Sequence, residues 1–229
     1  MNDQRFDALD RLGLNLQAVF DLAGLPGDLR TAVAPAPGER QLILIGNAGP
    51  TLWRTLTAAG TGGADPIDDF SRQAVCRWFA EHCPGHRARL LYPGDSPVGL
   101  QRLGQLAGWH HASPFRIGIQ PVWGSWFAYR VVLVTDTALP LTTPLDTESP
   151  CTRCADTPCI TACPADALAD RDFSLTRCIA YRCQPDSPCA TTCLARLACP
   201  VGSEHRYDEA QIRHGYGQSL KMIRHYATR

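Results

Sequence analysis

Apolar residues in the first half of the chain recur with two different spacings. The segment 41–50, QLILIGNAGP, contains a continuous apolar run from Leu42 to Ile45, which is typical of a central strand buried on both faces. Shorter runs predict strands within 14–25 and over 88–93. Helical spacing, with suitable start and stop residues, predicts helices over 3–13, 51–59, 65–83 and 99–109.

The segment 109–136 has a different character. We expect two strands there, FRIGIQP over 115–121 and SWFAYRVVLVTD over 125–136, the second long and central. Five large rings fall within 21 residues, a density that on pattern alone indicates a core. They are Trp109, Trp123, Trp126, Phe127 and Tyr129.

The remaining segments give an outline of the domains. The Pro-rich stretch 31–40 is predicted to be a loop, and 139–150 a linker. The segment 203–226 predicts a helix that is broken or bent near 215–217, where two glycines occur. Cys76 and Cys83, on the helix expected over 65–83, are predicted to be core thiols. The mixture of helices and strands predicts an α+β fold, an α/β sandwich.

Composition excludes some classes of function. The chain has 229 residues, 45% of them apolar, which is enough for one large and one small domain or for two small ones. Twenty-two basic residues balance 22 acidic ones, so charge gives no reason to expect nucleic acid or a membrane surface as a partner. The start, MNDQRFDALD, has no signal-peptide pattern, and no apolar run reaches membrane-spanning length. We therefore expect a cytoplasmic protein with reduced thiols.

Nine of the eleven cysteines lie between Cys151 and Cys199. The first four follow the spacing C-x2-C-x4-C-x3-C, and Pro164 comes directly after the fourth; Cys199 is likewise followed by Pro200. This run resembles that of bacterial-type two-cluster ferredoxins, with two extra residues before its third cysteine. In those proteins the fourth cysteine of each motif binds the other cluster.

The ferredoxin resemblance implies two 4Fe-4S clusters and a ligand set for each. The first cluster would be held by Cys151, Cys154, Cys159 and Cys199. The second would be held by Cys163, Cys178, Cys189 and Cys193, although the gaps in the second motif are longer than usual. Cys183 is left over.

Structural zinc and disulfides are the alternatives. Zinc sites usually pair two CxxC-like knuckles, and here only Cys151 and Cys154 form one. Disulfides would need an oxidising compartment. Iron–sulfur ligation is therefore the interpretation that we favour.

Longer stretches resemble a wider group of proteins. GSWFAYRVVLVTDTALPLTTP followed by CTRC and PCITACP looks like the junction into the two-cluster module of epoxyqueuosine reductases. ILIGNAGPTLW, ADPIDDFSRQAV and IGIQPVWGSWFAYRVVLV look like cblC-type cobalamin-processing proteins, and reductive dehalogenases belong to the same group. The resemblance covers about residues 14–200. It implies a nitroreductase-like, corrinoid-binding domain over 1–145, a two-cluster ferredoxin-like module over 146–202 and a C-terminal helical tail over 203–229.

Two departures limit what the resemblance implies. Gln120 stands where the cblC-type pattern has a histidine before its proline. The helical repeats that resemble the tRNA-docking region of epoxyqueuosine reductases are missing, as is a residue matching their general-acid aspartate. The substrate chemistry of that family is therefore not carried over, and no nucleic-acid partner is expected.

The resemblance implies an iron–sulfur electron-transfer protein that relays electrons to a corrinoid (cobalamin), with oxidoreductase as the class of activity. Ser125, Gln120 and Tyr129 would offer polar contacts to the corrinoid, and Trp126 would cover it. A flavodoxin, a ferredoxin or a reductase would be the redox donor. The alternatives are a plain electron carrier whose N-terminal domain docks a partner, and a flavin-dependent reductase on the same scaffold. No membrane partner is expected.

Overall fold

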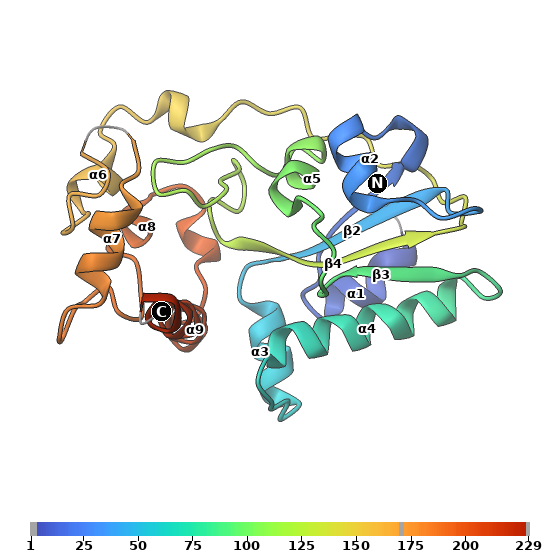
Figure 1. The fold of residues 1–229 in the computed structure, drawn as a ribbon, viewed down its shortest axis with the longest axis horizontal. Coiled ribbons are helices and arrows are strands. Elements are labelled where there is room, and N and C mark those ends of the chain that lie inside the picture. Colours follow the sequence, from blue (N-terminus) through green and yellow to red (C-terminus); the bar gives the residue numbers. More distant parts are fainter. Residues whose placement is uncertain (1–3, 170–171, 228–229) are drawn as a thin grey trace. The chain divides into compact units, whose positions relative to one another are not determined.

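The computed structural model describes residues 4–169 and 172–227, and these divide into two compact units (Figure 1). Unit 1 comprises the described residues of Met1–His110 together with Phe127–Asp146. Unit 2 comprises His111–Trp126 together with the described residues of Thr147–Arg229. The division differs from the predicted one, because 111–126 groups with the cysteine region and 203–227 is not a separate tail.

Unit 1 contains a four-stranded sheet, two short 3-10 helices and five α-helices among its described residues. Its elements are η1 (Gln4–Phe6), α1 (Asp7–Arg11), β1 (Leu16–Asp21), η2 (Leu22–Gly24), α2 (Gly27–Val33), β2 (Gln41–Ala48), α3 (Thr51–Ala58), α4 (Pro66–His82), β3 (Ala88–Tyr92), α5 (Leu100–Leu106) and β4 (Phe127–Thr135).

The sheet of unit 1 is antiparallel, with strand order β1-β2-β4-β3. All eight residues of β2 are buried, as the apolar run predicted, because β2 lies between β1 and β4. β4 is also an inner strand, paired with β2 and β3, which confirms its predicted central place. Helices and an antiparallel sheet together confirm the α+β class.

The sheet lies between two layers of helices (Figure 1). Ile43, Ile45, Val131 and Leu133 join one buried cluster with residues of α1, α3 and α4. Trp78 of α4 belongs to the same cluster, and its indole stacks on the Phe6 ring with 4.9 Å between the ring centroids. Burying such side chains contributes roughly 1.5–3 kcal/mol each.

Helices α2 and α5 cover the opposite face of the sheet (Figure 1). α5 approaches β4 closely because residue 104 is glycine: a Cβ there would lie 2.0 Å from the Tyr129 hydroxyl oxygen. Helix α2 was not predicted; its residues 31–33 fall in the segment expected to be a loop. It forms because Leu29 and Val33, four residues apart, both become buried.

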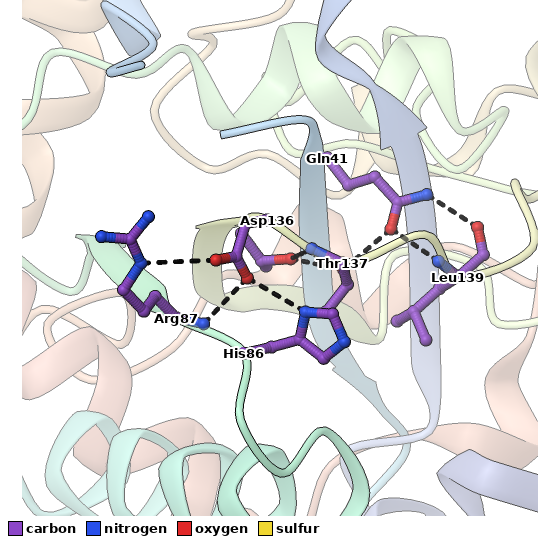
Figure 2. A network of polar contacts seen from close by, with 7 residues as sticks. Gln41, His86, Arg87, Asp136, Thr137 and Leu139 are labelled. Carbon is purple, nitrogen blue, oxygen red and sulfur yellow. Dashed lines mark hydrogen bonds and ion pairs between the residues drawn. The ribbon is translucent and has the colours of Figure 1, made fainter. Parts of the chain in front are cut away.

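Polar contacts fix the chain where β4 ends (Figure 2). The Asp136 carboxylate accepts hydrogen bonds from the Arg87 backbone N (2.8 Å) and Nε (3.3 Å), and its Oδ1 lies 3.1 Å from the His86 Nδ1. The Arg87 backbone bond, followed by the His86 and Arg87 side chains, lowers the pKa of Asp136. On the neighbouring strand the Gln41 amide exchanges two bonds with the Leu139 backbone, at 2.7 and 2.8 Å.

Unit 2 is built from short helices, one long helix, α9 (Glu209–Ala227), and irregular segments (Figure 1). Its elements within the described residues are η3 (Pro150–Arg153), α6 (Pro158–Thr161), α7 (Leu175–Arg182), α8 (Leu194–Ala198), η4 (Ser203–His205) and α9 (Glu209–Ala227). Among the residues that the structure describes, no helix has both the length and the apolar character needed to cross a membrane.

Glycines bring the segment 111–126 against the chain that follows Cys199. Gly124 and Gly202 both have positive φ, +56° and +63°. A Cβ on Gly124 would lie 1.9 Å from the Val201 carbonyl oxygen. Only glycine fits both the backbone conformation and this contact.

Three predictions about local structure were wrong. The segment 115–121 is not a strand; only isolated bridges join His111 to Ile119 and Gln120 to Gly124, and Pro121 cannot donate to a ladder. α9 continues through 215–217, because glycine lowers helix stability by only about 1 kcal/mol. Cys83 is buried as expected, but Cys76 is exposed.

Candidate metal centres

Four of the predicted ligand cysteines surround one cavity of 160 Å³ in unit 2. We call it the first cysteine cavity; its thiol-bearing lining residues are Cys151, Cys154, Cys159 and Cys199. Three of them lie in or next to η3 and α6, whereas Cys199 ends α8. Helices α6 and α8 pack together, and this contact brings Cys199 to three cysteines that precede it by 40 or more positions in the chain.

Local turns place the first three thiols. The Ser149 hydroxyl caps η3 and accepts from the Cys151 backbone N at 3.3 Å. Thr157 takes the left-handed conformation, with φ 39°, and Pro158 then starts α6. These turns bring Cys159 back toward Cys151, as a compact multi-thiolate site requires.

Burial favours the neutral form of Cys151, Cys159 and Cys199 when no metal is bound. It raises the pKa of Cys159 to about 11, and negative charge on Cys199, Cys151 or Cys154 would raise it further. Burial also raises the pKa of Cys151 and that of Cys199. A metal that binds thiolates must therefore displace protons here.

Four other cysteines surround a second cavity of 330 Å³, also in unit 2. We call it the second cysteine cavity; its thiol-bearing lining residues are Cys163, Cys178, Cys189 and Cys193. Cys178 lies on α7, and Cys193 directly precedes α8. Cys163 follows α6, so the chain passes from the first cavity to the second between Cys159 and Cys163.

The thiols of the second cavity have a cation beside them. Burial raises the pKa of both Cys178 and Cys189, and neighbouring thiolates raise it further. The Arg182 guanidinium opposes this effect at both cysteines. Arg182 is itself buried, on the same helix as Cys178 and four residues later.

Cys183 is placed differently from the other eight. It ends α7 and is half-buried. Among the described residues that line the two cysteine cavities, Cys183 does not occur.

The two cavities suit a multi-atom cluster. A water molecule takes up about 30 Å³ in the liquid, so each cavity is several times larger than a site for one small ion. Within residues 4–169 and 172–227, no three His, Cys, Asp or Glu side chains are arranged to hold a single metal ion. That arrangement concerns one ion; a four-iron cube takes its four thiolates at four separate corners. Thiolate is also the donor that iron–sulfur clusters use.

Three of the predicted corrinoid contacts lie in the interior of unit 2. Ser125 and Trp126 are wholly buried against Arg196: Nε donates to the Ser125 hydroxyl at 3.2 Å, and the guanidinium carbon lies 4.2 Å from the indole centroid. The Trp126 ring also meets Tyr207 edge-on, at 5.5 Å between centroids. Gln120 is buried, and its side-chain oxygen accepts from the Val122 backbone N at 3.1 Å.

The fourth predicted contact, Tyr129, lies on β4 in unit 1. Its hydroxyl is 3.0 Å from the His110 Nδ1, and the Phe127 ring meets it edge-on at 6.0 Å. Burial raises the pKa of Tyr129, so the phenol stays neutral at physiological pH. The structure therefore divides the four predicted residues between the two units.

Sequence reasoning missed two buried arginines of unit 2. Arg182 and Arg196 are 7% and 8% exposed. The sequence did contain a signal that these arginines lie near the cysteines. Arg182 follows Cys178 by four residues, and Arg196 follows Cys193 by three. Within a helix, such spacings place two side chains on one face.

Comparisons with known proteins extend the picture of the fold. No protein-family model matches the chain, and no curated protein sequence does. Among solved structures, the epoxyqueuosine reductase of Bacillus subtilis has a TM-score of 0.57 at 12% identity, covering 90% of this chain and 66% of that one. A reductive dehalogenase described as B12-dependent has a TM-score of 0.51 at 16% identity, covering 93% of this chain and 33% of that one.

A further neighbour is an epoxyqueuosine reductase with a bound tRNA stem loop, at TM-score 0.56 and 13% identity; it covers 92% of this chain and 67% of that one. At these identities the similarity concerns the fold. The chain spans about two thirds of the length of the reductases and one third of the dehalogenase. Since one protein of this fold binds nucleic acid, the expectation of no nucleic-acid partner stays a prediction.

Proposed function

We propose that this chain is an iron–sulfur electron-transfer protein with two 4Fe-4S clusters, one in each cysteine cavity. The observation that carries the proposal is the division of eight cysteines into two sets of four around two separate cavities. The two sets are those implied by the ferredoxin crossing, in which Cys199 joins the first set and Cys163 the second.

Bound clusters of this kind supply one-electron transfer. The chain's own residues hold them and shield them. Thiolates of each set would bind the iron atoms and release their protons on binding. The apolar linings, including Phe115 at both cavities, would exclude water from the sulfurs.

Iron content tests this part of the proposal. Protein purified and reconstituted without oxygen should carry about eight irons and eight sulfides per chain, with the absorbance and paramagnetic resonance of 4Fe-4S clusters after reduction. Zinc bound in stoichiometric amount, or an iron content near four, would contradict it.

We further propose that the electrons are delivered to a corrinoid held by the 1–145 domain, which would make the protein a cobalamin-dependent reductase or a cobalamin-processing protein. Support comes from fold similarity to a dehalogenase described as B12-dependent. Tyr129, which lies in unit 1, remains a proposed contact, whereas Gln120, Ser125 and Trp126 are buried inside unit 2 and are not proposed again. No D-x-H-x-x-G motif is present in the sequence, so we expect a corrinoid whose lower base is detached.

Titration with hydroxocobalamin, followed by gel filtration, tests the corrinoid. Retained corrinoid with base-off absorbance bands is the expected result. Tyr129→Phe removes only the hydroxyl and should weaken retention, whereas Trp126→Ala would also disturb the packing around Arg196. Retention of flavin in place of corrinoid would favour the flavin-dependent reductase, and retention of neither would favour a plain electron carrier.

A further inference from the structure

Among the buried hydroxyl groups of unit 2 that lack a partner with hydrogen-bond geometry, two line the second cysteine cavity. They are the Thr192 Oγ1 and the Tyr216 hydroxyl. Each is shielded from water, and neither has a partner with hydrogen-bond geometry among the described residues. A buried hydroxyl without a partner costs about 1–3 kcal/mol, so such groups usually point to a missing acceptor.

The acceptor would be in the cavity. Tyr216 lines the second cavity together with Cys193, and its hydroxyl lies close to the Cys193 thiol and to the Arg196 guanidinium. Its side chain therefore lies beside a proposed iron ligand of the second set. Sulfur atoms of a thiolate-bound cluster carry negative charge and accept hydrogen bonds.

Arg182 adds a full positive charge to the same cavity. Its guanidinium donates to the carbonyl oxygens of Cys189 (3.2 Å), Ala190 (3.4 Å) and Tyr216 (2.8 Å), and to the Ser219 hydroxyl (3.1 Å). All four acceptors are neutral. Within the described part of the chain, no carboxylate forms an ion pair with Arg182. The positive charge of Arg182 is therefore available to stabilise an anion bound in the cavity.

The first cysteine cavity has no counterpart to these groups. Among the described residues that line it, none is charged, and Thr157 is the only one with a side-chain hydroxyl. Four prolines contribute to the lining instead, namely Pro114, Pro150, Pro158 and Pro200. The two cavities thus offer the same four thiols in different electrostatic surroundings.

We infer that Arg182, Thr192 and Tyr216 tune the second cluster to a higher reduction potential than the first, so that an electron shared between the two resides mainly in the second cavity. The inference rests on the proposed function. Reduction adds one electron, hence one negative charge, and no bond is formed or broken. A buried cation and two hydrogen-bond donors stabilise that added charge, and both are known determinants of cluster potential.

The test is a redox titration of the holoprotein, with dithionite as the electron donor and paramagnetic resonance as the readout. Tyr216→Phe and Thr192→Val each remove one hydroxyl and little volume, so both variants should fold and keep about eight irons. Each should lower the equilibrium constant for one-electron reduction of the second cluster by about three- to tenfold. A tenfold decrease corresponds to a reduction potential lower by about 59 mV. Arg182→Gln should lower it further, and Arg182→Lys should restore part of the loss.

Matched controls separate tuning from a structural role. Tyr207→Phe removes another buried hydroxyl of unit 2 that has no partner, but Tyr207 does not line the second cavity, so both potentials should stay unchanged. The Cys189→Ser protein, which keeps the ligands of the first cavity, identifies the potential that belongs to that cavity.

The outcomes are distinct. Eight irons with potentials that do not move in Tyr216→Phe, Thr192→Val and Arg182→Gln would overturn the inference and leave the proposed function intact. A first cluster with the higher potential would overturn it as well. Protein that holds no clusters would overturn both.

Discussion

The two cysteine cavities use the same ligand chemistry in unlike surroundings. The first is small, 160 Å³, and is lined mainly by apolar side chains and prolines. The second is 330 Å³ and includes a buried arginine and two hydroxyls without partners. Spacing of cysteines therefore indicates where clusters would bind, whereas the residues around them decide how two similar clusters would differ.

The largest expected effect is the loss of one cluster. Cys189→Ser removes a thiol that lines the second cavity and should leave about four irons per chain. Cys183→Ser, six residues earlier, changes a thiol that lines neither cavity, so this variant should keep the full content. Iron and sulfide assays on anaerobic protein measure both. Loss of a cluster in Cys183→Ser alone would mean that the ligand set of the second cavity is wrong.

The next effect concerns the buried cation of the second cavity. Arg182→Gln leaves four hydrogen-bond acceptors without their donor and should lower the free energy of unfolding by roughly 2–4 kcal/mol. The measurement is chemical denaturation under anaerobic conditions.

Arg213→Gln on α9 is the matched control for Arg182→Gln. Arg213 is mostly exposed and pairs with Glu209 one turn away, so its change should stay within about 0.5 kcal/mol. Equal effects of the two substitutions would show that the second cavity does not depend on its arginine for stability.

The third effect is specific to the first cavity. In Gly124→Ala the new Cβ would clash with the Val201 carbonyl, and the residue would keep a positive φ. Val201 lines the first cavity next to Pro200 and Cys199, so the shift should reach the cluster site there. We expect a cost of about 1–3 kcal/mol and faster loss of iron from the first cavity than from the second.

Chelator challenge, followed by paramagnetic resonance of the remaining cluster, measures this selectivity. Gly62→Ala is a suitable control because nothing lies within 4 Å of its added Cβ. If Gly124→Ala released iron from both cavities at the same rate, the first cavity would not depend on this close approach.

Much of this organisation could be predicted from the sequence. The buried run of β2 and the long β4 were recognisable because apolar residues on an inner strand leave a continuous pattern. The segment 115–121 was wrongly predicted to be a strand because its apolar residues pack within unit 2, while Gly118 and Pro121 disfavour a strand ladder. Local composition does not distinguish these two outcomes.

The candidate sites show the same limit. The ferredoxin resemblance implied the same two sets of four cysteines that line the two cavities, although their role as ligands stays a prediction. The Tyr216 hydroxyl could not be found from the sequence, because Tyr216 lies 23 residues beyond Cys193, on another helix. Only the folded chain brings it to the cavity.

The smallest expected effect lies on α9, which lends Tyr216 to the second cavity. Gly217 is inside this helix, and nothing lies within 4 Å of an added Cβ. Gly217→Ala should therefore stabilise the protein by about 0.5–1 kcal/mol, because alanine loses less backbone entropy in a helix than glycine does. A rise in the denaturation midpoint with unchanged cluster potentials would show that α9 positions Tyr216 without needing a flexible residue beside it. A shift in the second potential alone would instead mean that the glycine sets the position of the Tyr216 hydroxyl.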